Sequence, residues 1–143
     1  MFLGEYEYKV DNKGRLPLPP KFRQEFVNGL VLTRGQEACI FGYRNADFEK
    51  NANTLAPERI IESEQQRKLK RAIFSTAERL VLDSQGRIAL PASLRNYAQI
   101  QGTATIVGVG DRIELWNPEL WSPAKSEAEK QAPEIIENLV SQQ

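Results

Sequence analysis

The N-terminal part of the chain alternates apolar and polar side chains. In residues 5–10 every second position is apolar, which is typical of a half-buried strand. Turn-forming residues occupy 11–14, where Gly14 can adopt a positive φ without steric cost. The alternation resumes at 16–18, so the pattern predicts a hairpin with a longer loop. Pro17 cannot donate a backbone hydrogen bond, which places the second strand at a sheet edge or bulge.

After residue 18 the apolar spacing becomes helical and then continuous. Phe22 and Phe26 lie four positions apart, on one face of a short helix that follows two prolines. Apolar runs at 30–33 and 38–41 predict two strands joined by a turn. A further helix is expected to begin near Phe48.

Residues 6–26 recur at 78–98, with a constant offset of 72. The residues that are identical in both copies are Asp11/Asp83, Gly14/Gly86, Arg15/Arg87, Leu18/Leu90, Pro19/Pro91 and Arg23/Arg95. The second copy therefore predicts the same order of elements, with a short helix from residue 91 and strands at 103–109 and 113–116. Each half has about 70 residues and a thin core, so we expect the halves to pack on each other.

The repeat divides the chain into four parts. They are a first module at 1–56, a connecting helix at 57–73, a second module at 74–121 and a polar C-terminal tail at 122–143. Ile60, Ile61 and Leu69 are expected to provide the packing face of the connecting helix. In the tail, residues 133–140 are compatible with a short amphipathic helix or with disorder.

Composition narrows the classes of function. The chain has 19 basic and 19 acidic residues, but residues 1–72 hold 13 basic and 10 acidic ones, which allows a local basic patch. The absence of histidine excludes His-based zinc sites and nucleophile pairs. Cys39 is the sole cysteine and lies in an apolar run, so we expect a buried thiol. No run of residues has the length of a membrane span, and Glu5 interrupts any signal peptide, which predicts a soluble cytoplasmic protein without membrane association.

The repeated unit Asp-x-x-Gly-Arg, at 11–15 and 83–87, is the main functional candidate. Turn chemistry alone explains it, because the aspartate can cap its own backbone and pair with the arginine. For a single copy we favour this structural explanation by about two to one. The position of Lys13 beside Arg15 on an exposed loop shifts the balance, since cationic loop tips reach phosphates and base edges.

Catalysis is the weaker interpretation. Asp11 and Asp83 could form a two-carboxylate site, but an arginine near each one lowers its pKa and favours a permanent anion. The sequence contains no glycine-rich phosphate loop, and its serines lack an obvious base. We therefore expect no enzyme activity, no catalytic or metal-binding residues and no cofactor.

Several motifs in order resemble the bacterial MraZ proteins, from Met1 to about Trp121. They are Met1-Phe2-Leu3-Gly4-Glu5-Tyr6, Asp11-x-Lys13-Gly14-Arg15-Leu16, Leu18-Pro19-x-Lys21-Phe22-Arg23, Gly29-Leu30-Val31-Leu32-Thr33-Arg34-Gly35 and Val107-Gly108-Val109-Gly110-x-Arg112-Ile113-Glu114-Leu115-Trp116. Each motif alone is weak, whereas the ordered set is quite specific.

This resemblance implies a fold and a function. The fold would be mainly β with short helices (α+β), built from two tandem SpoVT/AbrB-like swapped-hairpin modules intertwined into one β-barrel-like unit. The function would be transcriptional regulation of the division and cell-wall gene cluster, by a nucleoid-associated, ring-shaped homo-oligomer. The Asp-x-x-x-Arg signature of the family falls on Asp11/Arg15 and Asp83/Arg87.

Together these observations predict roles for individual residues. Lys13, Arg15 and Arg87 are expected to contact double-stranded DNA, in a promoter with short tandem repeats. The residues expected to orient the loops are Asp11, Gly14, Asp83 and Gly86. A ring would multiply modest contacts through effective concentration, and residues after Ser122 should be dispensable for it. The alternative is an oligomeric assembly protein that binds a protein partner through the same loops.

Overall fold

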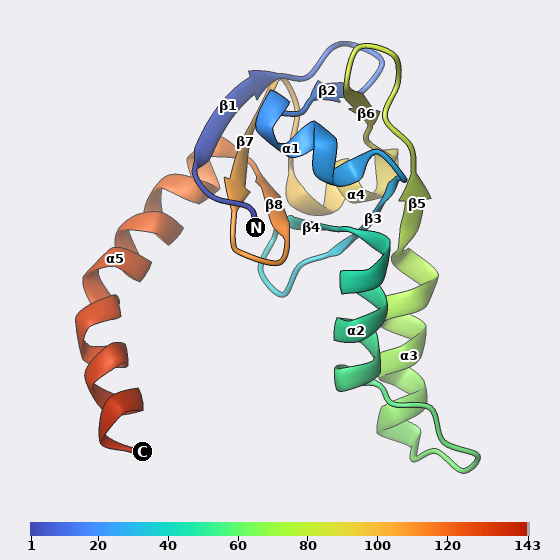
Figure 1. Cartoon of the computed structure of the whole chain (residues 1–143), viewed down its shortest axis with the longest axis vertical. Coiled ribbons are helices and arrows are strands. Elements are labelled where there is room, and N and C mark those ends of the chain that lie inside the picture. Colours follow the sequence, from blue (N-terminus) through green and yellow to red (C-terminus); the bar gives the residue numbers. More distant parts are fainter. Residues whose placement is uncertain (143) are drawn as a thin grey trace.

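Eight strands and six helical segments form the chain in the computed structural model, which describes residues 1–142 (Figure 1). The strands are β1 (Glu5–Lys9), β2 (Arg15–Pro17), β3 (Leu30–Arg34), β4 (Ile40–Tyr43), β5 (Glu78–Leu80), β6 (Arg87–Ala89), β7 (Thr103–Gly108) and β8 (Ile113–Trp116). The helices are α1 (Pro20–Arg23), α2 (Asn45–Leu55), α3 (Glu64–Thr76), α4 (Ala92–Ala98) and α5 (Pro118–Ser141), with a 3-10 turn η1 (Gln24–Phe26). The predicted β-rich α+β class is confirmed, although α5 is longer than expected and α3, with 13 residues, is shorter than the predicted helix at 57–73.

Strands from the two halves are interleaved. The six-stranded sheet has the order β1-β7-β8-β4-β3-β5, and every neighbouring pair is antiparallel. Its centre holds one hairpin from each half, β3-β4 and β7-β8. The outer strands are exchanged, since β1 pairs with β7 and β5 pairs with β3. The predicted intertwining of the modules is therefore confirmed. Within residues 1–142 no ladder joins β1 to β5, so backbone hydrogen bonds leave this sheet open.

The first strand does not form the predicted hairpin with the second. Instead β2 pairs with β6 in a separate two-stranded sheet, with Leu16 opposite Ile88. Both of these side chains are fully buried. The predicted local pairing was wrong because alternation identifies a strand without identifying its partner. Pro17 does lie on an edge strand as predicted, because a two-stranded sheet consists of edges.

One hydrophobic core serves both halves. Phe2, Phe22 and Phe26 meet there, with ring centroids 5.2 Å apart for Phe2 and Phe22 and 5.0 Å apart for Phe2 and Phe26. The other buried members are Val10, Leu16, Leu18, Leu30, Leu32, Ile40, Ile88, Leu90, Leu94, Ala98, Ile100, Ala104, Ile106, Ile113 and Leu115. Since both halves contribute to this set, each half depends on the other to remove its apolar surface from water.

A smaller apolar cluster lies on the opposite face of the central strands. It contains Cys39, Phe41, Tyr43, Val107 and Trp116, which alternate with residues of the main core. The first turns of α5 cover it with Leu120, Trp121 and Ala124. Cys39 is buried as predicted, and burial raises the pKa of its thiol to about 12.

The connecting helix begins later than the predicted residue 57. Ser63 forms a capping box with Gln66, because its hydroxyl accepts from the Gln66 backbone N–H while the Gln66 side chain accepts from the Ser63 backbone N–H. The residues before Ser63 are irregular. Ile60 and Ile61 lie in that irregular segment and are exposed, so their predicted packing role was wrong.

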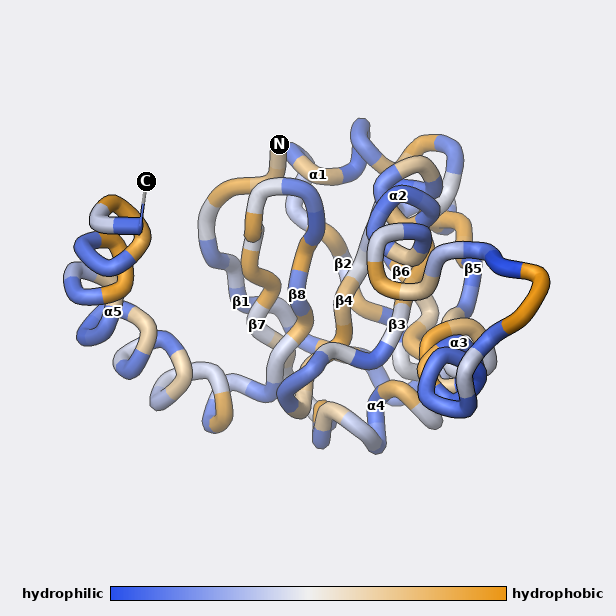
Figure 2. Tube along the Cα trace, turned by 90° about the horizontal axis from the view of Figure 1, so that it is seen from below, coloured by the Kyte–Doolittle hydropathy of each residue, from blue (hydrophilic) through white to orange (hydrophobic). Residues whose placement is uncertain are grey.

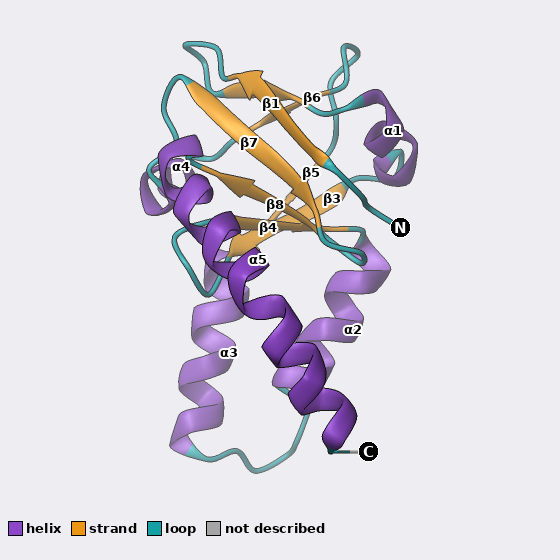
Figure 3. Cartoon of the chain, turned by 90° about the vertical axis from the view of Figure 1, so that its left-hand side faces the viewer, coloured by secondary structure: helices purple, strands orange, loops and turns teal. Residues whose placement is uncertain are grey.

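The C-terminal segment is one continuous helix. Of the two alternatives for 133–140, helix is correct, but α5 has 24 residues and starts at Pro118. Asn117 caps it, with its side-chain oxygen accepting from the Glu119 backbone N–H. After its first turns α5 leaves the body, and it projects on the same side as α2 and α3 (Figures 1 and 3). None of the helices described within residues 1–142 is long and apolar enough to span a membrane.

Candidate nucleic-acid interface

The first Asp-x-x-Gly-Arg loop is organised by a single carboxylate. Asp11 Oδ1 accepts from the backbone N–H groups of Lys13 and Arg15, each at 2.9 Å, and Oδ2 accepts from Arg15 Nε at 2.6 Å. Gly14 has a φ of +79°, in the left-handed region that favours glycine. The turn therefore holds the Arg15 side chain by its Nε.

The second loop repeats this geometry. Asp83 Oδ1 accepts from the backbone N–H groups of Gln85 and Arg87 at 2.9 Å, and Oδ2 accepts from Arg87 Nε at 2.8 Å. Gly86 has a φ of +75°. The two loops differ in their exposed tips, where Gln85 stands in place of Lys13.

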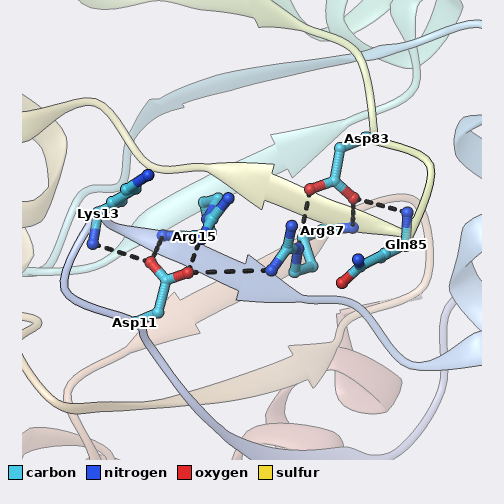
Figure 4. Close-up of polar contacts among 6 residues, drawn as sticks. All are labelled: Asp11, Lys13, Arg15, Asp83, Gln85 and Arg87. Atoms are coloured by element: carbon cyan, nitrogen blue, oxygen red, sulfur yellow. Dashed lines mark hydrogen bonds and ion pairs between the residues drawn. The ribbon is translucent and has the colours of Figure 1, made fainter.

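Pairing of β2 with β6 brings the two loops together. Figure 4 shows the two strands side by side, with Arg15 and Arg87 between the aspartates. Arg87 Nη1 lies 3.9 Å from Asp11 Oδ2, so one guanidinium reaches the carboxylates of both halves. The two loops thus form one continuous polar surface on the two-stranded sheet, which we call the loop platform (residues 11–15 and 83–87).

Hydrogen bonding keeps both aspartates ionised. The backbone N–H of Arg15 is the main cause that lowers the pKa of Asp11 from its ordinary 3.8 to about 2. The backbone N–H of Arg87 likewise lowers the pKa of Asp83. Carboxylates with depressed pKa values, separated by a guanidinium, are poorly suited to share a proton or to act as general acids. The platform is therefore better suited to present charge than to transfer protons.

The cationic side chains of the loop platform differ in solvent exposure and in ion pairing. Lys13 is exposed and has no carboxylate within ion-pair distance among residues 1–142. The side chain of Arg15 is 35% exposed and that of Arg87 is 22% exposed. Because only Arg87 is shared between two aspartates, Arg15 has the more available guanidinium. Within residues 1–142 no cluster of three or more His, Cys, Asp or Glu side chains offers a metal site.

Comparison with known proteins shows to which family the chain belongs. The family model described as "MraZ protein, putative antitoxin-like" matches residues 1–71 and 73–140. Two relatives from Dehalococcoides mccartyi, strains BAV1 and 195, are both named Transcriptional regulator MraZ. Each is 41% identical over 140 residues, which cover 97% of this chain and 98% of the relative. The chain belongs to the MraZ family. The resemblance inferred from its motifs is thereby confirmed.

Two further arginines in this MraZ family chain lie against the loops. Arg23 donates from Nε to the carbonyl of Leu18 at 2.9 Å, and Arg95 makes the equivalent bond to Leu90 at 3.0 Å. Each supports the loop of the other half, since a Cβ on Gly86 would collide with Arg23 and one on Gly14 would press on Arg95. The loops are further tied across the halves by backbone bonds, Leu18 N–H to Gly86 C=O and Leu90 N–H to Gly14 C=O.

Sequence reasoning assigned no function to Arg23 and Arg95. The signal was present, because this pair is one of the six identical pairs in the repeat. Their position relative to the loops could not be inferred, however, since it depends on the exchange of partners between the halves.

Proposed function

We propose that this protein is a sequence-specific DNA-binding transcriptional regulator of the division and cell-wall gene cluster. Membership of the MraZ family, together with relatives named as transcriptional regulators, supports the regulatory part of this proposal. The observation that carries DNA binding is the loop platform, where two arginines from different halves lie side by side with their Nε atoms fixed.

Each platform residue has a proposed role. Arg15 contacts a base edge or a phosphate through its terminal Nη groups, and Lys13 adds a phosphate contact. Arg87 makes a second, more restricted contact. Asp11 and Asp83 orient the arginines instead of touching DNA, because a carboxylate near phosphate is repelled. Gly14 and Gly86 allow the turns that hold both carboxylates in place.

In this proposal the affinity for DNA comes from several loop platforms that bind one DNA segment together. The chain has a net charge of +0, so a single platform offers little long-range attraction for DNA. A ring-shaped homo-oligomer would present several platforms to a promoter with short tandem repeats, and effective concentration would multiply their contacts. Association with the nucleoid follows from such binding. In this scheme 1–56 and 74–121 are the two modules that build the platform, 57–73 connects them and 122–143 lies outside both.

Selection of bound fragments from genomic DNA tests the proposal directly. We expect recovery of tandem short repeats with regular spacing, and an affinity that falls steeply between two salt concentrations as counterions are released. Failure to select any DNA, together with salt-independent capture of a protein partner that needs Lys13 and Arg15, would instead indicate an assembly protein.

A further inference from the structure

The outer face of the two-stranded β2–β6 sheet carries both arginines and two apolar residues. Leu16 and Ile88, at the centre of the two strands, are opposite each other and fully buried. Because side chains alternate along a strand, the residues on either side of them face away from the core. These outer residues are Arg15 and Pro17 in β2 and Arg87 and Ala89 in β6.

The strand register places each arginine beside an apolar residue. Arg15 lies directly opposite Ala89, and Arg87 lies directly opposite Pro17. Side chains that are directly opposite in an antiparallel pair have Cβ atoms about 5 Å apart. The sheet therefore presents a guanidinium next to a hydrocarbon group twice, once at each of its ends.

A guanidinium beside a hydrocarbon group matches two neighbouring base edges in DNA. The major groove admits a two-stranded β-ribbon, and an arginine in it can donate two hydrogen bonds to O6 and N7 of a guanine. Thymine presents a methyl group in the same groove, and small apolar side chains contact it. Neighbouring bases lie about 3.4 Å apart along one DNA strand. Two side chains with Cβ atoms about 5 Å apart can therefore contact a guanine and an adjacent thymine together.

The two ends of the β2–β6 sheet are not equivalent. The side chain of Arg15 is 35% exposed, and its partner Ala89 is also exposed. The side chain of Arg87 is only 22% exposed and also faces Asp11, and its partner Pro17 is partly buried. Asp11 binds the Nε of Arg15, so a base contact by Arg15 falls to its two Nη groups. The end with Arg15 and Ala89 is therefore the better suited to read bases.

We propose that Ala89 determines base specificity, by contacting the methyl group of a thymine next to the guanine that Arg15 reads. Ala89 belongs to neither apolar cluster of the fold, and alanine is less frequent in strands than β-branched residues. Neither core packing nor strand propensity therefore accounts for an alanine at this position. The inference rests on the proposed DNA binding and extends it to a residue outside both Asp-x-x-Gly-Arg loops.

Uracil in place of thymine tests the contact on the unaltered protein, because uracil lacks only the methyl group. In DNA recovered by the genomic selection, the guanine read by Arg15 is the one whose replacement weakens binding of the wild type but not of Arg15→Ala. Uracil beside this guanine should weaken binding by the wild type about fourfold per repeat, the loss expected for one buried methyl group. Uracil between the repeats is the control and should leave the affinity unchanged. A selected repeat without a thymine beside this guanine overturns the inference.

Variants of Ala89 test whether this residue makes the contact. Ala89→Gly should bind the thymine and uracil DNAs with equal affinity, whereas Ala92→Gly, the same change at an exposed position outside the sheet, should keep the fourfold difference. Circular dichroism checks folding, and Ala89→Ser, which adds a polar hydroxyl to Cβ, should reduce the difference if the glycine variant does not fold.

The outcomes separate this inference from the proposed function. A fourfold difference that persists in the Ala89 variants assigns the thymine to another residue and overturns the inference. DNA binding by the wild type without any effect of uracil also overturns the inference and leaves the proposed function standing. Failure of the wild type to select any DNA overturns both.

Discussion

In Arg15 and Arg87, the aspartate of the same loop binds only one part of the guanidinium, the Nε. In both residues Nε is bound by the aspartate four positions earlier, at 2.6 Å and 2.8 Å. This fixes the direction of the side chain before any ligand arrives, so less rotamer entropy is lost on binding. The number of donors that remain available differs, because Arg87 also faces Asp11.

Arg15→Ala should abolish specific DNA binding while folding and assembly stay intact. A lost bidentate base contact costs about 1–3 kcal/mol per loop, and the loss recurs in every subunit that touches DNA. An electrophoretic shift with operator DNA measures this, with Arg15→Lys as a control that keeps the charge but not the planar fork. Unchanged binding by Arg15→Ala would show that Arg15 only stabilises its turn.

Arg87→Ala should lower thermal stability at least as clearly as it lowers affinity. The Arg87 guanidinium lies 2.8 Å from Asp83 and 3.9 Å from Asp11, so its removal leaves each carboxylate with one cation fewer. Melting temperature and DNA affinity should be measured on the same preparation. An unchanged melt with abolished binding would make the second loop a DNA reader equal to the first.

Asp11→Asn should destabilise the protein near neutral pH and lose this effect in acid. The pKa of Asp11 is depressed in the folded chain, to about 2 from 3.8, so its stabilising effect is present above about pH 4 and disappears as pH falls through about 2. The difference in melting temperature between wild type and variant, followed from pH 7 to pH 2, should shrink toward zero. A constant difference would assign the effect to the shape of the amide instead of to the charge.

At the scale of elements, sequence reasoning identified most strands and few of their partners. The alternation at 5–10 and the helical pair Phe22/Phe26 are local signals, and the corresponding elements are present. The pairing of β1 with β7 depends on contacts about 100 residues apart, which no local pattern specifies. The same limit explains why Arg23 and Arg95 were missed, whereas Asp11 and Arg15 were found within one loop.

The predicted boundaries of α3 and α5 were wrong for a different reason. The sequence predicts a connecting helix from residue 57, where a proline suits a helix start. The capping box of Ser63 and Gln66 instead satisfies two backbone N–H groups at the N-terminus and sets the start seven residues later. The sequence did not predict the full length of α5, because an internal proline usually ends or kinks a helix, and α5 contains both Pro123 and Pro133.

Gly86→Ala should destabilise the chain, and Gly102→Ala should not. At Gly86 an alanine would adopt a φ of +75°, which costs about 1–2 kcal/mol for an L-residue, and its Cβ would displace Arg23. At Gly102 the φ is not positive and the Cβ would enter open space. Chemical denaturation of both variants measures the difference. Equal stability of the two would show that the loop relaxes around the new side chain.

At the scale of the whole molecule, binding should depend on how many repeats one DNA segment carries. Linking several sites raises the overall affinity by about 10²–10⁴ when geometry permits simultaneous contact. We expect DNA with four repeats to bind the wild type far more tightly than DNA with one repeat. The same chain at a concentration where light scattering shows only monomer should show almost none of this gain. An equal gain for the monomer would mean that the repeats act without assembly.

The exchange of β1 and β5 between the halves affects how far the sequences of the two halves can differ. The two halves have the geometry of a two-fold dimer, yet a peptide segment joins them, so a substitution in one half need not appear in the other. A true dimer would carry Lys13 on both tips, or on neither, and would end in two helices of equal length. Here one tip is cationic and the other is not, and α5 has 24 residues where its counterpart α2 has 11. Because the halves are joined in one chain, an almost symmetric body has two ends that differ. Identical subunits need two different surfaces to bind head to tail in a closed ring.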